Sequence, residues 1–179
     1  NVTIDSVIGT TTGTLTKYGA GTLTLSDTNT YTGLTTVKAG TLAYGASDVI
    51  ATGDVTVDGA TAVLALGANR TATVGTVTLS GGGSITGTGT SALTTTGTFE
   101  MQSGSASAIL AGTGIVLNKT TTGTITLTGA NTYTGATNVS AGVLNIQNAT
   151  GLGTTAAGTT VSSGATLQLQ GGITVGAET

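Results

Sequence analysis

Residues 21–42 read Gly21-Thr-Leu-Thr-Leu-Ser-Asp-Thr-Asn-Thr-Tyr-Thr-Gly-Leu-Thr-Thr-Val-Lys-Ala-Gly-Thr-Leu42. Almost the same wording returns at residues 123–144, as Gly123-Thr-Ile-Thr-Leu-Thr-Gly-Ala-Asn-Thr-Tyr-Thr-Gly-Ala-Thr-Asn-Val-Ser-Ala-Gly-Val-Leu144. The two copies are identical at 14 of 22 positions and lie at a constant offset of 102 residues. Repetition of this kind predicts an architecture in which each unit packs on its neighbours.

Each copy predicts three short strands joined by two bends. Apolar and hydroxyl residues alternate in residues 22–25, so the leucines point to one side and the threonines to the other. Residues 29–33 predict a turn, because Asn and Gly accept left-handed backbone angles. The predicted inward-facing core residues are Leu23, Leu25, Val37, Leu42, Ile125, Leu127, Val139 and Leu144. The predicted turn residues are Asn29, Tyr31, Gly33, Asn131, Tyr133 and Gly135.

The composition favours folded β structure. The chain of 179 residues contains 31 Gly and 46 Thr, and it has no Pro, Cys, His or Trp. Thr suits strands and Gly suits tight bends. A disordered chain would be rich in charge and poor in aliphatic residues, whereas here 37% of the residues are hydrophobic and the mean hydropathy is positive.

Short apolar segments recur along the whole chain without helical periodicity. About twenty of them, at three per coil, predict one β-solenoid over residues 1–179 with roughly seven or eight coils. The 102-residue offset then corresponds to about five coils. A β-sandwich would need several tight hairpins, and Asp58-Gly59 is the only dipeptide of the Asn-Gly or Asp-Gly type.

The two copies at residues 21–42 and 123–144 resemble the autotransporter-associated β-strand repeat of secreted passenger domains. The resemblance implies a single-stranded, right-handed parallel β-helix that is exported and displayed on the surface of a Gram-negative cell. It also implies flanking passenger repeats and a C-terminal translocator barrel outside this segment. Because the chain begins at Asn1 and stops within the pattern, we expect a segment of a longer protein.

Charge and composition argue against several function classes. The net charge is -3 and only four residues are basic, so nucleic-acid binding is not expected. No pattern predicts a cofactor, a metal site or a catalytic constellation. Asp54 and Asp58 form a weak acidic pair on one predicted outward face, which is where a β-helix carbohydrate-active enzyme would place carboxylates. We expect these two side chains to serve solubility instead.

The main expectation is a structural stalk that holds other modules away from the outer membrane. A binding module is the alternative. Ranks of Thr pairs such as Thr22/Thr24, Thr76/Thr78 and Thr124/Thr126 would suit ice. Tyr31 and Tyr133 are most simply turn residues packed on the coil, although exposed tyrosines would suit host glycans. The pairs are not evenly spaced, which disfavours ice, and no host or surface ligand is identified.

The ends of the chain predict self-association. Residues 171–179 read as a strand in which Ile173 and Val175 alternate, with Glu178 as the single charge, and residues 2–4 read as a strand at the other end. Unpaired strand edges are templates for another copy. We therefore expect the chain to associate end to end.

Overall fold

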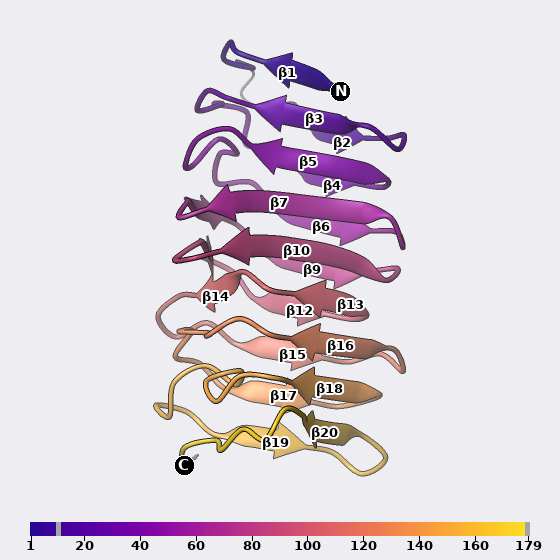
Figure 1. Cartoon of the computed structure of the whole chain (residues 1–179), viewed down its shortest axis with the longest axis vertical. Helices are drawn as coiled ribbons and strands as arrows, with labels where there is room; N and C mark the ends of the chain where they lie inside the picture. Colours follow the sequence, from indigo (N-terminus) through magenta and orange to yellow (C-terminus); the bar gives the residue numbers. More distant parts are fainter. Residues whose placement is uncertain (10–11, 178–179) are drawn as a thin grey trace.

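The alternating Thr-aliphatic segments fold as parallel strands that stack from one end of the molecule to the other (Figure 1). The computed structural model describes residues 1–9 and 12–177. They form a β-solenoid of about eight turns without a helix. The predicted all-β parallel solenoid of seven or eight coils is confirmed.

The first long sheet, sheet A, faces the viewer in Figure 1. Its nine strands pair in parallel and in chain order along the molecule. They are β1 Val2–Ile4, β3 Thr22–Leu25, β5 Gly40–Tyr44, β7 Ala62–Ala68, β10 Gly83–Thr88, β13 Gly104–Ala106, β16 Thr124–Leu127, β18 Val143–Ile146 and β20 Thr166–Leu169.

The second long sheet, sheet B, lies behind sheet A in Figure 1 and has eight strands. They are β2 Leu15–Lys17, β4 Thr35–Val37, β6 Val55–Asp58, β9 Val77–Ser80, β12 Phe99–Met101, β15 Leu117–Lys119, β17 Thr137–Val139 and β19 Thr159–Val161. Along this sheet Thr35 reaches Thr137 after five parallel pairings, so the 102-residue offset spans five coils.

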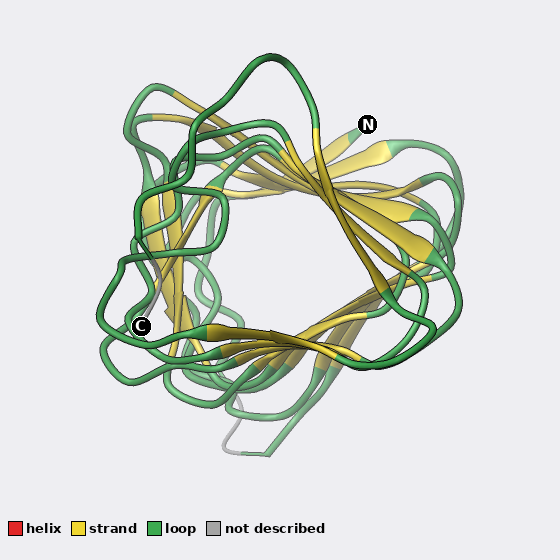
Figure 2. Cartoon of the chain, turned by 90° about the horizontal axis from the view of Figure 1, so that it is seen from below, coloured by secondary structure: helices red, strands yellow, loops and turns green. Residues whose placement is uncertain are grey.

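Seen end-on, the solenoid has strands on three sides (Figure 2). On the third side, paired strands occur only in three neighbouring coils of the described chain. There the three strands β8 Thr71–Val74, β11 Ala92–Thr95 and β14 Ile109–Ala111 form sheet C. The Asn-Thr-Tyr-Thr-Gly segments occupy the same side in two other coils. Residues 132 and 133 donate backbone hydrogen bonds to the Leu110 carbonyl at 2.9 and 3.2 Å, so the second segment lies along the edge of β14.

The coils differ in length. Leu23 pairs with Leu42, 19 residues later, whereas Ile146 pairs with Leu169, 23 residues later. Parallel pairing fixes which side chains stack but leaves the connections free, so the added residues are accommodated in the corners.

One aliphatic core runs through the stack. Inward-facing residues alternate with outward-facing ones along each strand, and the inward ones form a single buried cluster. Of the predicted core residues, seven are fully buried: Leu25, Val37, Leu42, Ile125, Leu127, Val139 and Leu144.

Two expectations about the ends are wrong. Leu23, expected to be nearly fully buried, is half-buried, because its neighbour on the outer coil is Val2, which is itself 61% exposed. Residues 171–177 form no strand. Gly171 and Gly172 take positive φ angles of 90° and 69° and end the extended conformation, although Ile173 and Val175 pack partly against the core. Glu178 lies outside the described residues.

Candidate functional site

The most specific side chains of the repeat point inward and bind the backbone of neighbouring coils. Asn29 Oδ1 accepts a hydrogen bond from the Ile8 amide at 2.7 Å, and Asn29 Nδ2 donates to the Val49 carbonyl at 2.6 Å. These partners lie one coil before and one coil after the asparagine. On this side of the coil, the side-chain amide therefore replaces the backbone N–H and C=O groups through which a strand would pair with the neighbouring coils.

The second repeat has the same arrangement. Asn131 Oδ1 accepts from the Leu110 amide at 3.0 Å, and Nδ2 donates to the Gly151 carbonyl at 2.8 Å. Both asparagines are buried. A buried amide that is hydrogen-bonded to the coil before it and to the coil after it fixes both in one register.

The tyrosine of each repeat is buried inside the coil. Tyr31 and Tyr133 are fully buried, and their hydroxyls lie 2.9 and 2.7 Å from the hydroxyls of Thr35 and Thr137. Burial raises the pKa of the Tyr31 hydroxyl, and the Thr35 hydrogen bond opposes that rise. Both rings pack against the coil, as the preferred interpretation of these tyrosines had it, and neither is exposed to bind a glycan.

Gly33 and Gly135 serve a purpose other than the expected one. Neither has a positive φ angle, and neither do the asparagines, so the left-handed turn expected here does not occur. The segment instead passes so close to the previous coil that a Cβ atom at Gly33 or Gly135 would overlap the carbonyl of Gly13 or Ile115. Glycine is required by this close approach of two backbones.

Two functional residues of the repeat were missed from the sequence. Lys17 and Lys119 lie 102 residues apart, just before the two quoted stretches, and both side chains are buried. Each ammonium donates hydrogen bonds to backbone carbonyls. The signal was available, because Leu15-Thr-Lys17 and Leu117-Asn-Lys119 extend the identity toward the N-terminus, but a lysine in an alternating strand is normally assigned to the outward face.

The acidic pair is engaged in contacts between coils. Asp54 precedes β6, and its carboxylate accepts a hydrogen bond from the Thr76 amide at 2.7 Å. Asp58 forms an ion pair with Lys38 at 2.6 Å and accepts from the Ser80 hydroxyl at 2.9 Å. Lys38 holds the pKa of Asp58 below its usual value, with help from Ser80, and Asp58 raises the pKa of Lys38.

The described part of the chain contains no group of three or more acidic, His or Cys side chains that could hold a metal ion. Nor does it contain a helix long and apolar enough to cross a membrane.

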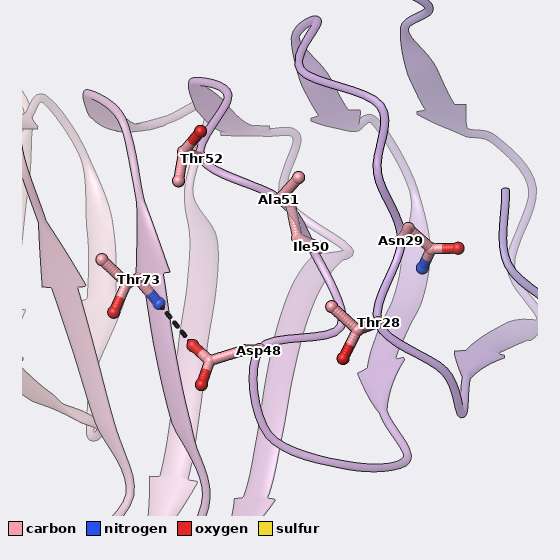
Figure 3. A pocket seen from close by; sticks show the side chains of 7 residues that line it. All are labelled: Thr28, Asn29, Asp48, Ile50, Ala51, Thr52 and Thr73. Atoms are coloured by element: carbon pink, nitrogen blue, oxygen red, sulfur yellow. Dashed lines mark hydrogen bonds between the residues drawn. The ribbon is translucent and has the colours of Figure 1, made fainter. Parts of the chain in front are cut away.

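A surface pocket of about 370 Å³ lies on the third side, beside the first repeat (Figure 3). One carboxylate and several hydroxyls line it. The Asp48 carboxylate accepts a hydrogen bond from the Thr73 amide at 3.0 Å, so it too connects two coils. The lining residues are Thr28, Asn29, Asp48, Ile50, Ala51, Thr52 and Thr73.

The threonine pairs do not form one rank. Thr22/Thr24 and Thr124/Thr126 belong to sheet A, whereas Thr78 belongs to sheet B and Thr76 comes just before its strand β9. Within sheet A the ladder of Thr22 is not an unbroken rank of threonine. It passes through Thr41, Val63, Ser84, Ser105, Thr126, Asn145 and Gln168.

Comparison with known proteins agrees with the arrangement of the repeats. The sequence model of the family described as passenger-associated-transport-repeat matches residues 15–43 and 117–146. Both matches begin two residues before a buried lysine and contain the asparagine, the tyrosine and the glycine described above. Searches of curated proteins and of solved structures each found no match. The chain is therefore a parallel β-solenoid with two segments that match the passenger-associated-transport-repeat, in agreement with the resemblance to the autotransporter passenger repeat.

Proposed function

We propose that the chain is a structural spacer of a cell-surface passenger domain, which carries other modules away from the outer membrane and has no catalytic role itself. The observation that carries this proposal is the direction of the repeated side chains. The asparagine, tyrosine and lysine of each repeat are buried and are bound to the chain's own backbone or hydroxyl groups. Residues repeated in this way support the stack of coils.

The geometry suits a spacer. Each coil adds one strand to each long sheet, and stacked strands lie about 4.8 Å apart. Because each coil contacts mainly its neighbours, the length increases with the number of coils while the cross-section stays constant. The aliphatic core continues from coil to coil, so the rod resists bending at any single point.

The test changes the length without changing the surface chemistry. Residues 30–131 are duplicated in tandem, so that the added 102 residues begin and end at equivalent points of the two repeats. We expect a folded rod that is longer by about 24 Å, five coils, in small-angle scattering. Between an outer-membrane carrier barrel and a small epitope, the longer rod should raise antibody access through a surface polysaccharide layer.

A glycan array separates the spacer from a binding module. The natural chain and Asp48→Ala, which alters the surface pocket, are applied side by side. Saturable binding of one saccharide that is lost in Asp48→Ala would contradict the spacer proposal. Equal, unsaturable signals together with the length effect would support it.

A further inference from the structure

The two buried lysines occupy positions that the rest of sheet B fills with apolar side chains. Lys17 is 7% exposed and Lys119 is fully buried. In the remaining coils the equivalent inward position is aliphatic or methionine. These residues are Val37, Val57, Leu79, Met101 and Val139, which are buried, and Val161, which is exposed on the last strand of sheet B. An aliphatic side chain therefore fits this ladder, and the lysines are not needed to fill the core.

Each ammonium joins the corner of its own coil to the corner of the next coil. Lys17 Nζ donates to the Tyr18 and Gly19 carbonyls at 2.9 and 2.6 Å, and to the Ala39 carbonyl at 3.0 Å. Lys119 Nζ donates to the Thr121 carbonyl, and to the Ala141 carbonyl at 3.0 Å. In both repeats the carbonyl of the next coil belongs to the residue 22 positions after the lysine.

Carbonyl oxygens stabilise these charges without a carboxylate. Among the described residues the ion pair found is that of Lys38 with Asp58, which lies on the surface. Burial lowers the pKa of the Lys119 ammonium. A buried charge is costly unless it has hydrogen-bond partners. One carbonyl partner of each lysine belongs to the following coil, so the charge has that partner only when the following coil is folded.

We propose that Lys17 and Lys119 are interlocks, each of which makes the coil of its repeat and the coil that follows open and close as one unit. The ammonium is fully bonded only when the next corner is in place, so the two corners stabilise each other. The inference rests on the proposed structural function, to which it adds a unit of local unfolding.

Two further observations support this unit. The family matches, residues 15–43 and 117–146, start just before the lysine and end just after the carbonyl that it reaches in the next coil. The asparagine of the same repeat links the following coil as well, since Asn29 and Asn131 donate to Val49 and Gly151. The matched segment thus contains both ends of the lysine link.

Because the chain has no cysteine, a cysteine introduced at one position can be alkylated there alone. The ammonium group of the lysine can therefore be tested by itself. Lys119→Cys is alkylated in the unfolded state and refolded. Bromoethylamine gives a side chain with the length and charge of lysine, and bromopropane gives a neutral side chain of the same length. The two proteins share one sequence and differ in the ammonium. Met101→Leu, in the adjacent coil of the same ladder, is the control for ordinary changes in packing.

Hydrogen–deuterium exchange is the measurement. The Ser140 and Ala141 amides donate to the Lys119 carbonyl at 2.8 and 3.2 Å and report on the second corner. We expect wild-type exchange rates there in the aminoethylated protein and in Met101→Leu, and rates at least tenfold higher in the propylated protein, with β8 and β11 unchanged.

Equal rates in the two alkylated proteins would overturn the proposal. So would a uniform acceleration along the chain, because it would show a general loss of stability without a local unit. If neither protein alkylated at position 119 refolds, the same pair at Lys17→Cys, read at Lys38 and Ala39, decides. These exchange rates do not depend on the length of the rod or on access to a displayed epitope, so failure of the interlock and failure of the spacer function are distinguishable.

Discussion

At the scale of single residues, the repeat preserves side chains that bond across coils. Alternation predicted the direction of most aliphatic residues, because an aliphatic side chain between two hydroxyl residues has one energetically acceptable direction. Leu25 and Leu127 are fully buried, whereas Leu23 beside the outermost strand is half-buried. Alternation could not assign Lys17 and Lys119, since the carbonyls that stabilise their charge come partly from a coil 22 residues away.

Replacement of tyrosine by phenylalanine should have opposite effects on the free energy of unfolding at Tyr31 and Tyr44. Tyr31 has the Thr35 hydroxyl as its partner, whereas the buried Tyr44 hydroxyl has no hydrogen-bond partner among the described residues. Tyr31→Phe should therefore lower the free energy of unfolding by about 1–2 kcal/mol, because it leaves the buried Thr35 hydroxyl unpaired. Tyr44→Phe should raise it by up to about 1 kcal/mol. Denaturant titration measures both, and equal losses would contradict these assignments.

A neighbouring pair tests the inward and outward faces of β16. Leu127 is fully buried, and Thr126 lies on the outer face between Ser105 and Asn145. Leu127→Asp should cost about 3–5 kcal/mol, because it places a charge among aliphatic side chains. Thr126→Asp should cost less than about 1 kcal/mol. Thermal melts that show similar losses would mean that the faces are reversed.

At the scale of elements, the third side of the coil decides what the repeat does. Asn-Thr-Tyr-Thr-Gly was interpreted as a turn from its residue types. It is an irregular segment that lies along its neighbours and uses an asparagine in place of strand pairing. Turn propensities describe local geometry, whereas the need for glycine at Gly33 and Gly135 comes from the carbonyl of the previous coil.

The contact between β6 and its neighbours should depend on pH. Lys38 first, and then Ser80, lowers the pKa of Asp58 in the folded chain. A carboxyl whose folded pKa is lowered stabilises the fold above its unfolded value, and this contribution is lost as pH falls through the lowered pKa. The difference in melting temperature between the natural chain and Asp58→Asn should therefore be present at pH 6 and diminish as the pH falls through the lowered pKa of Asp58. A difference that is constant over this range would contradict the assignment.

At the scale of the whole molecule, the number of coils was predictable and their lengths were not. Counting apolar segments predicts seven or eight turns, because each strand needs one apolar face. The lengths of successive coils depend on corner loops, which carry little pattern. The strand predicted at residues 171–177 does not form, because Gly171 and Gly172 take positive φ angles that the alternation of Ile173 and Val175 does not reveal.

End-to-end association of the chain stays a prediction. The outermost strands β1 and β20 each pair on one side only, and they expose Val2 and Leu169. Such edges can accept another copy through a contact that continues into rods. Small-angle scattering over a concentration series should show increasing length at constant cross-section, and a monomer at millimolar concentration would contradict the prediction.

The repeated polar residues hold neighbouring coils together, and the free energy of unfolding of Asn131→Asp tests this role. This near-isosteric change keeps the acceptor for the Leu110 amide but removes the donor to the Gly151 carbonyl and buries an acid. We predict a loss of about 2–4 kcal/mol. Asn148→Asp is the control, because the exposed hydrogen bonds of Asn148 use its side-chain oxygen and survive the change. Equal, small losses for the two variants would contradict the claim.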